Sequence, residues 1–313
     1  MGSRVTVVGA GNVGSNTARR IAEKDLADEV VMIDIVEGLP QGLALDINQS
    51  AAVEEFECRV VGTNDYADTA ESDVVVITAG LPRKPGMSRM DLLDTNTKIV
   101  GGVTEQIAAN SPDTTIIVVS NPLDEMTYLA SIVSDFPKER VMGMAGVLDS
   151  SRLRFFIAEK LDVPPASVEA LTLGSHGDQM VALPRHATVQ GKPLPELVDE
   201  PTLEQLFQRT KDAGAEIVKY LQKGSAFYAP SSSAARMVNA ILGDTGEVLP
   251  TCAWTSGQYG ISDVYLGVPA SLGKGGVTGI VELDLNEDEL TQLRDAAEAI
   301  RDKCKELASL RNK

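Results

Sequence analysis

One histidine in this sequence has the surroundings of a proton-transfer group. His176 follows a strand-like run, Leu171–Leu173, and stands between Gly174 and Gly177, which leave its ring sterically open. An imidazole titrates near neutral pH and is a natural acceptor of a proton from an alcohol. The only other histidine, His186, lies in an apolar, proline-containing stretch, and we expect it to pack structurally.

Two charged residues earlier in the chain are candidates to serve this histidine. Asp149 and Arg152 are spaced by three, and helical composition continues through Leu153–Leu161, so both side chains would point from one helix face. A buried carboxylate would stabilise the cationic form of His176 after it takes a proton. Asp149 is our candidate for that carboxylate, and Asp178 is the local competitor. Taken alone, Asp149 and Arg152 also fit a surface ion pair, which contributes little.

Two arginines lie on a segment with the composition of a loop. Gly80–Leu92 follows a run of buried-strand character, Asp73–Ala79, and carries Arg83 and Arg89. Its helix and strand breakers are Pro82, Pro85 and Gly86. Because a guanidinium pairs bidentately with carboxylate or phosphate, we predict a cover that grips a small anion. A solvated surface loop is the alternative for this segment taken alone.

A glycine-rich turn follows the first apolar strand. Gly9, Gly11 and Gly14 form a GxGxxG pattern between Val5–Val8 and a helical stretch, and Asp34 ends the next apolar run. This is the context of a dinucleotide-binding fingerprint, in which the helix start binds the pyrophosphate and the acidic residue binds the adenosine ribose. Asp34 would repel a 2′-phosphate, so we predict one NAD rather than NADP. A plain strand–turn–helix is the alternative.

Strands and helices alternate through the first half of the chain. The strand-like runs are Val5–Val8, Val30–Ile35, Arg59–Val61, Val74–Thr78, Ile116–Ser120 and Val141–Met142. Between them lie helical segments such as Leu39–Val53, Leu92–Ala109 and Asp124–Ser134. This alternation predicts a parallel sheet that is covered on both faces and binds ligands at the carboxyl ends of its strands.

After about Gly143 the alternation fades, which indicates a second domain. Helices are expected over Leu203–Leu221 and Ser232–Leu242, and a closing helix starts near Asn286. We expect its apolar stripe to pack in the core; the stripe is Leu290, Leu293, Ala297, Ile300, Cys304 and Leu307. The predicted fold is a Rossmann-type doubly wound parallel sheet over residues 1–143, followed by an α+β substrate or catalytic domain over residues 144–313.

Composition and charge exclude several classes of partner. The chain of 313 residues has a formal net charge of −17, whereas nucleic acid and anionic membranes require a basic surface. Cys58, Cys252 and Cys304 are far apart and have no histidine at ligand spacing, so we expect reduced thiols, no metal site and a cytoplasmic location. No apolar run approaches the ~20 residues of a membrane helix. No secretory leader is expected, since the first strand begins at about Arg4.

At these residues the chain resembles the lactate/malate dehydrogenase family, and within it the malate-specific members of lactate-dehydrogenase-like type. The resemblance runs essentially end to end. Five motifs carry it, in order along the chain: Gly9–Gly14 with Asp34, Ala79–Arg89, Val119–Pro122, Leu148–Arg152 and Gly174–Asp178. It implies an NAD-dependent 2-hydroxy-acid oxidoreductase of the tricarboxylic acid cycle, assembled as a homotetramer from dimers.

The resemblance implies a role for each of these side chains. Arg152 would bind the first substrate carboxylate. His176 would take the hydroxyl proton while hydride passes to the nicotinamide, and Asp149 would orient and stabilise the imidazolium. Arg89 would stabilise the charge that develops on the carbonyl oxygen in the other direction, and Asn121 would hydrogen-bond the substrate beside the nicotinamide.

Cofactor contacts and substrate choice also follow from the resemblance. The implied cofactor-binding residues are Gly9, Ala10, Gly11, Asn12, Val13, Gly14, Asp34, Asn96, Val119 and Asn121. Arg83 stands where the lactate enzymes carry an uncharged residue, which implies a second substrate carboxylate and hence malate and oxaloacetate. A buried dianion needs matching cations, because an unpaired buried charge costs on the order of several kcal/mol.

Two other functions remain open at this point. A dehydrogenase for lactate or another 2-hydroxy acid is the nearest alternative, and Arg83 is the residue that discriminates against it. A non-catalytic NAD-responsive regulator on the same fold would need the glycine turn. It would not need His176, Asp149 and three arginines together.

Overall fold

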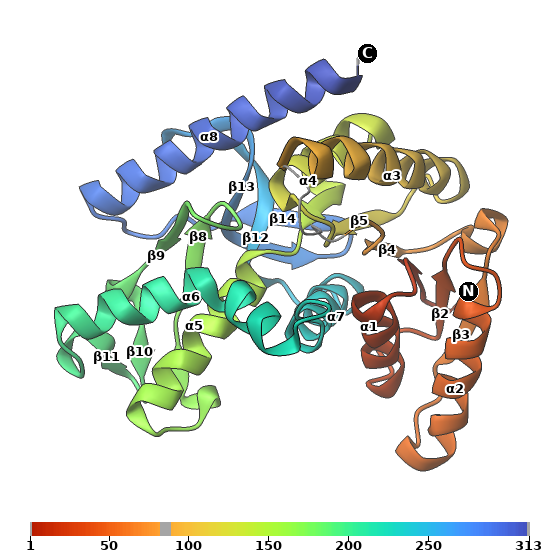
Figure 1. Ribbon diagram of the computed structural model, residues 1–313, viewed down its shortest axis with the longest axis horizontal. Coiled ribbons are helices and arrows are strands. Elements are labelled where there is room, and N and C mark those ends of the chain that lie inside the picture. Colours follow the sequence, from red (N-terminus) through yellow and green to blue (C-terminus); the bar gives the residue numbers. More distant parts are fainter. Residues whose placement is uncertain (1, 82–88, 312–313) are drawn as a thin grey trace.

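The computed structural model describes residues 2–81 and 89–311, without the side chains of residues 89, 310 and 311 (Figure 1). Six strands are parallel: β1 (Arg4–Val8), β2 (Glu29–Ile33), β3 (Arg59–Thr63), β4 (Val74–Ile77), β5 (Thr115–Val118) and β6 (Val141–Gly143). Their spatial order is β3-β2-β1-β4-β5-β6. The predicted Rossmann-type doubly wound sheet is therefore confirmed.

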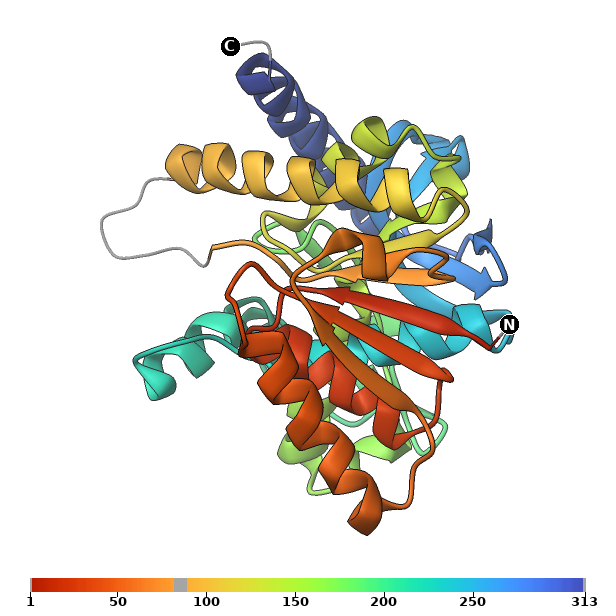
Figure 2. The same ribbon diagram turned by 90° about the vertical axis from the view of Figure 1, so that its right-hand side faces the viewer.

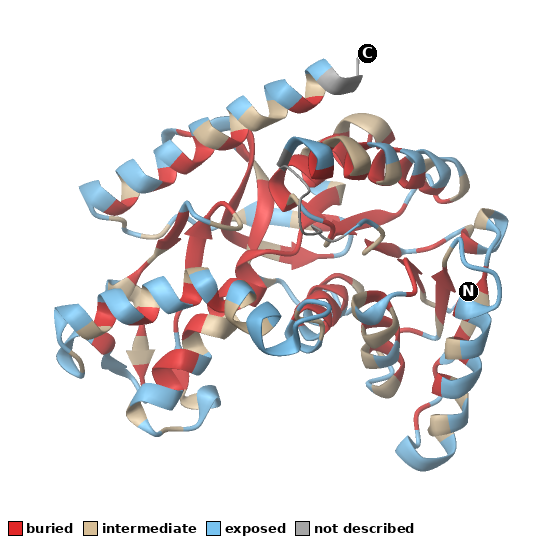
Figure 3. Cartoon of the chain, in the orientation of Figure 1, coloured by how far each residue is buried: buried red, intermediate tan, exposed pale blue. Residues whose placement is uncertain are grey.

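Helices cover both faces of this sheet (Figure 2). All four residues of β4 are buried, and they alternate between two cores. Val74 and Val76 belong to one core with residues of α1 (Asn12–Glu23) and α2 (Leu39–Glu54), whereas Val75 and Ile77 belong to another with residues of α3 (Arg89–Asn110) and α4 (Leu123–Ser134). Continuous apolar strands form here because each face of the strand is covered by a helix. Figure 3 shows the buried strands between helices whose outer faces are exposed.

The second half of the chain adds helices and short strands around the first sheet. The helices are α5 (Gly146–Leu161), α6 (Glu200–Leu221), α7 (Tyr228–Leu242) and α8 (Glu287–Arg311). The short strands are β7 (Val168–Glu169), β8 (Thr172–Gly174), β9 (Met180–Ala182), β10 (Thr188–Val189) and β11 (Lys192–Pro193). The apolar stripe expected on α8 does pack in the core: Leu293, Ala297, Ile300 and Leu307 are buried, and Leu290 and Cys304 are partly buried against them.

Unexpectedly, the sheet does not end at β6. β12 (Glu247–Ser256) pairs antiparallel with β6 and with β13 (Ser262–Gly273), which in turn pairs with β8 and with β14 (Gly276–Ile280). The sequence patterns did not predict this hairpin. Pro250 and Pro269 lie within its strands, opposite each other, and proline argues against an interior strand because it cannot donate to the ladder. The β-branched and aromatic residues of both strands were the available signal.

Glycines allow the close strand approaches that join the two halves. β6 meets β12 where Gly143 faces Cys252, and β13 meets β8 where Gly267 faces Gly174. A Cβ on Gly267 would lie 2.4 Å from the carbonyl oxygen of Gly174, so a side chain at that position would force the strands apart. The carboxyl end of β6, which leads into α5, is therefore held in register with the end of β8.

Among the described residues, we find no helix whose length and apolar content would let it cross a bilayer. In the same part of the chain, no cluster of three or more histidine, cysteine, aspartate or glutamate side chains is arranged to hold a metal ion. The three cysteines are free thiols.

Candidate active site

The side chains of His176 and Asp149 lie in contact, although they follow different strands of the sheet. Asp149 lies in the first turn of α5 and is 2% exposed, while His176 follows β8 through Gly174, which has a φ of +85°. His176 Nδ1 is 2.8 Å from Asp149 Oδ2. Because the carboxylate can only accept, Nδ1 carries the proton and Nε2 is left to exchange one. The competitor, Asp178, is exposed and has no hydrogen bond to the His176 ring in the described structure.

Burial and charge act on His176 in opposite directions. Burial alone would lower the pKa of the imidazole, but the ion pair and hydrogen bond with Asp149 raise it, and the charge of Asp124 adds to the increase. The nearby Arg152 opposes this. The net result is a pKa above the ordinary histidine value, so the ring can hold a proton at neutral pH and release it under mild conditions.

Arg152 is a largely buried cation, and one of its donors is unsatisfied within the described structure. Its guanidinium Nη1 is 3.4 Å from Asp149 Oδ1, a long contact, and its side chain is only 14% exposed. Its Nε is buried, and no residue in the described part of the chain gives it a hydrogen-bond partner. Burial lowers the pKa of Arg152, and the charge and hydrogen bond of Asp149 raise it in part. A guanidinium nevertheless stays charged at neutral pH. An unsatisfied buried donor is costly, so this group is suited to receive an anion.

Asn96 and Asn121 lie together at the end of β5. Asn121 follows β5, and its backbone carbonyl accepts a hydrogen bond from Asn96 Nδ2 at 2.6 Å. Asn96 is 1% exposed, and its amide also bonds the backbone N–H and carbonyl of Leu81, at 2.8 and 3.1 Å. The described contacts of Asn96 are therefore structural, and a cofactor contact from Asn96 or from the neighbouring Val119 stays a prediction.

The arginine loop is described only at its ends. Arg83 lies outside the described residues. Arg89 begins α3, but its side chain is not described. The roles expected for Arg83 and Arg89 therefore stay predictions.

The glycine turn has the geometry that a bound pyrophosphate requires. Gly9 has a φ of +99°, and a Cβ on Gly14 would lie 1.7 Å from the carbonyl oxygen of Gly9, so both positions need glycine. A Cβ on Gly11 would meet nothing within 4 Å, which leaves open space above the turn. The N-terminus of α1, at Asn12 and Val13, has no side-chain cap, so its N–H groups can serve a phosphate.

Asp34 ties the second strand to this turn. Its Oδ2 accepts the N–H of Ala10 at 2.7 Å, and its Oδ1 accepts the N–H of Val36 at 2.9 Å. The carboxylate is therefore oriented before any ligand binds, with acceptor capacity left for ribose hydroxyls. The residues of the turn and Asp34 fit NAD.

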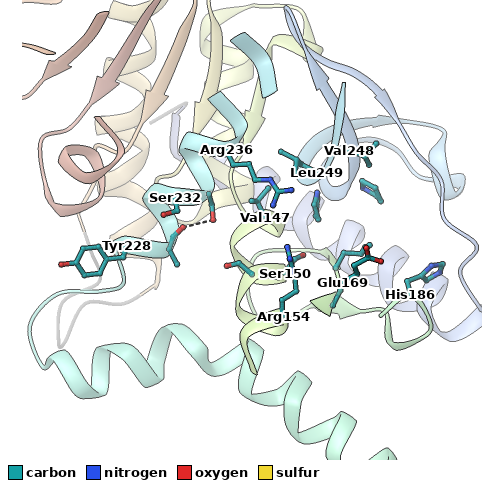
Figure 4. A pocket seen from close by; sticks show the side chains of 17 residues that line it. Val147, Ser150, Arg154, Glu169, His186, Tyr228, Ser232, Arg236, Val248 and Leu249 are labelled. Atoms are coloured by element: carbon teal, nitrogen blue, oxygen red, sulfur yellow. Dashed lines mark hydrogen bonds between the residues drawn. The ribbon is translucent and has the colours of Figure 1, made fainter. Parts of the chain in front are cut away.

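A separate surface pocket of about 740 Å³ lies on another face of α5 (Figure 4). Val147, Ser150 and Arg154 of α5 line it, whereas Asp149 and Arg152 do not. His186 also lines this pocket, and its Nε2 donates to the carbonyl of Asp284 at 2.9 Å. That contact agrees with the structural role expected for His186.

One residue near the site was not singled out from the sequence. Asp124, in the first turn of α4, is 3% exposed, and its Oδ2 accepts the backbone N–H of His176 at 3.1 Å. Acidic residues at the start of a helical run give no signal of this kind, because the contact spans 52 residues of chain.

Two family models cover nearly the whole chain. The model described as lactate/malate dehydrogenase, NAD binding domain, matches residues 3–143. The model described as lactate/malate dehydrogenase, alpha/beta C-terminal domain, matches residues 146–310.

Individual relatives agree with these models. A malate dehydrogenase of Salinibacter ruber is 55% identical over 99% of this chain and 98% of its own length. A malate dehydrogenase of Chloroherpeton thalassium is 52% identical over 98% of this chain and 99% of its own length. A solved Salinibacter ruber malate dehydrogenase has a TM-score of 0.95 and 53% identity, with 99% of both chains covered. A solved lactate dehydrogenase of Cryptosporidium parvum, complexed with lactic acid and nicotinamide adenine dinucleotide, has a TM-score of 0.94 and 39% identity, with 98% of both chains covered. Malate and lactate enzymes thus share this backbone, so substrate choice rests on side chains.

The position of Asp34 predicts strong discrimination between cofactors. A 2′-phosphate would face a carboxylate that is already oriented, and like charges in contact cost several kcal/mol. We expect kcat/KM for NADH to exceed that for NADPH by at least ~100-fold. Asp34→Asn should narrow the ratio of kcat/KM for NADH to that for NADPH. Asp46 is an exposed carboxylate on α2, and Asp46→Asn should leave this ratio unchanged. Comparable values for NADH and NADPH in the parent protein would contradict the role of Asp34.

Proposed function

The chain belongs to the lactate/malate dehydrogenase family, and from that premise we propose that it oxidises malate reversibly to oxaloacetate with NAD, using His176 as the proton acceptor. One observation carries the proposal: the His176–Asp149 pair lies beside the largely buried guanidinium of Arg152, whose Nε has no partner among the described residues. A hydroxy acid matches this arrangement because it presents an anionic carboxylate next to a reacting hydroxyl. A non-catalytic regulator would have no use for the pair.

The side chains divide the reaction between binding and proton transfer. Arg152 binds the substrate carboxylate and thereby orients the neighbouring hydroxyl towards His176 Nε2. His176 removes the hydroxyl proton, and Asp149 stabilises the resulting imidazolium through Nδ1–H. In the reverse direction the imidazolium returns the proton to the carbonyl oxygen, where Arg89 stabilises the developing charge. NAD, when bound, supplies the acceptor for the hydride. Asn121 hydrogen-bonds the substrate beside it.

Substrate choice is assigned to Arg83. Malate carries two carboxylates, and Arg152 neutralises one of them. A second cation is needed for the other, since an unpaired charge in a site that excludes water is strongly unfavourable. Arg83 supplies that cation, and a lactate-type substrate with a methyl group would leave it unpaired. The nearest alternative function, that of a lactate dehydrogenase, is disfavoured for this reason.

Domain division and location follow from the same assignment. We propose an NAD-binding domain over residues 1–143, which contains the glycine turn and Asp34, and a catalytic domain over residues 144–313, which contains Asp149, Arg152 and His176. The free thiols of the three cysteines support a reducing, cytoplasmic location.

The proposed assembly is a homotetramer built from dimers. Such an assembly needs at least two separate self-complementary surfaces. Two groups of exposed apolar side chains support this. On α2, Leu45 and Val53 are 61% and 80% exposed, and that helix shows an exposed outer face in Figure 3. Around the pocket beside α5, Tyr228 and Val248 are 63% and 46% exposed.

The pH dependence of catalysis tests the role of His176. Malate oxidation needs the neutral imidazole, so its rate should rise with pH through the raised pKa of His176. Oxaloacetate reduction needs the imidazolium, so its rate, followed by NADH absorbance, should fall over the same interval. Asp149→Asn removes the charge that raises this pKa and should move both transitions to lower pH.

A direct substitution complements the pH profile. His176→Asn should lower kcat by roughly 10²–10⁴-fold while NADH still binds, as measured by fluorescence titration. Activity of His176→Asn within a few-fold of the parent would show that another group transfers the proton.

The substrate role of Arg83 has its own test. Arg83→Gln should lower kcat/KM for oxaloacetate and raise it for pyruvate. Losing one partner of a buried charge costs ~3–5 kcal/mol, which is roughly a hundred- to several-thousand-fold in the ratio of the two substrates. Lys84→Gln removes a neighbouring cation and should preserve the ratio, and Arg89→Gln should depress turnover of both substrates. An unchanged ratio in Arg83→Gln would remove the basis for assigning specificity to this residue.

Light scattering after gel filtration tests the assembly. The parent chain should have the mass of four copies, and Leu45→Glu and Val248→Glu should each give a smaller species, because a buried unpaired charge opposes association. Val281→Glu changes an exposed apolar residue outside both groups and should keep the parent mass. A monomeric parent, or variants that all keep its mass, would contradict the proposed surfaces.

A further inference from the structure

Asp124 is a buried carboxylate that contacts the main chain of His176. Its Oδ2 accepts the N–H of His176 at 3.1 Å, and its Oδ1 lies 3.3 Å from the thiol sulfur of Cys252 on β12. His176 is therefore held by two carboxylates from different helices: Asp149 of α5 binds the ring, and Asp124 of α4 binds the backbone. Both carboxylates are almost completely buried.

The charge of Asp124 is not needed for a purely structural bond. An amide oxygen would accept an N–H without the cost of burying a carboxylate. Burial raises the pKa of Asp124 to about 6, and Glu125 adds to the increase, while the charge of His176, the Cys252 thiol and the His176 N–H oppose it. Among the described residues, Cys304 of α8 also lies within electrostatic range of Asp124. The carboxyl thus titrates close to the range in which the histidine works.

Asp124 also lies next to the substrate-side segment of β5. It stands in the turn that follows Asn121, whose backbone carbonyl is bonded by Asn96. A short segment at the start of α4 therefore begins with Asn121 and ends with Asp124, which holds the His176 backbone. A shift of this helix end would move both residues together.

We propose that Asp124 is a positioning residue for proton transfer, which holds the His176 backbone in place and, as an anion, stabilises the imidazolium from the main-chain side. This inference rests on the proposed role of His176. Because two interacting charges affect each other equally, protonation of Asp124 must weaken the hold of His176 on its proton. Protonation also removes the charge from the acceptor of the His176 N–H, which weakens the bond that positions this residue, so oxaloacetate reduction should lose activity on the acid side near pH 6, the pKa of Asp124. It should also lose activity on the alkaline side as His176 deprotonates.

Asp124→Asn tests the proposal, because the amide keeps an oxygen for the His176 N–H but removes the charge. We expect kcat for oxaloacetate reduction to fall by ~10–100-fold, the usual effect of losing a charged hydrogen-bond partner. The KM and the NADH affinity should change little. The acid-side loss near pH 6 should disappear, and the alkaline-side transition should move to lower pH. A variant with a lower melting temperature but a parent-like pH profile would show a merely structural role and overturn the proposal.

Cys252→Ala provides a second test that keeps Asp124 in place. The thiol hydrogen bond lowers the pKa of Asp124, so its loss should move the acid-side transition to higher pH and leave the alkaline side unchanged. Cys252→Ala remains a test of the proposal if Asp124→Asn does not fold. An acid-side transition at the same pH as in the parent would overturn the proposal. The two levels of inference are separable: a parent chain that does not reduce oxaloacetate contradicts the proposed function, whereas an active parent with unaffected variants contradicts only the role of Asp124.

Discussion

The buried hydrogen bond between His176 and Asp149 joins two segments that the sheet brings together. Asp149 lies just after β6 and His176 just after β8, and the path between them runs through β12 and β13 of one continuous sheet. Gly143 and Gly267 permit the close strand contacts along that path. The register of the sheet therefore sets the distance between the proton acceptor and its carboxylate. A small change in strand spacing would separate the two groups, because a hydrogen bond weakens steeply with distance and angle.

The acidity of the chain makes this local arrangement necessary. A net charge of −17 repels a dicarboxylate at long range, although salt screens that repulsion beyond ~8 Å. Binding must therefore come from contacts at short range, where burial strengthens each interaction. The Nε of Arg152, which has no partner in the described structure, can offer such a contact to an anion. Asp149 contacts both this cation and the histidine, so the proposed binding group and the proposed proton acceptor are positioned together.

Carboxylates with two functions recur in this molecule. Asp34 holds the glycine turn through Ala10 and is the residue predicted to bind the cofactor ribose. Asp149 orients the ring of His176 and raises its pKa. In each case a backbone or side-chain donor immobilises the carboxylate before a ligand arrives, which lowers the entropy lost on binding.

Local patterns in the sequence were sufficient for much of this protein. The glycine turn, Asp34, the parallel strands and the bounds of most helices follow from short-range periodicity, and the five motifs identified the family. The sequence favoured Asp149 as the partner of His176 and kept Asp178, only two residues away, as a competitor; the structure has the hydrogen bond to Asp149. The sequence did not reveal the β12–β13 hairpin or the contact of Asp124. These features depend on which strands pair and in which register, and such long-range contacts are set by packing of the whole sheet rather than by the preferences of neighbouring residues.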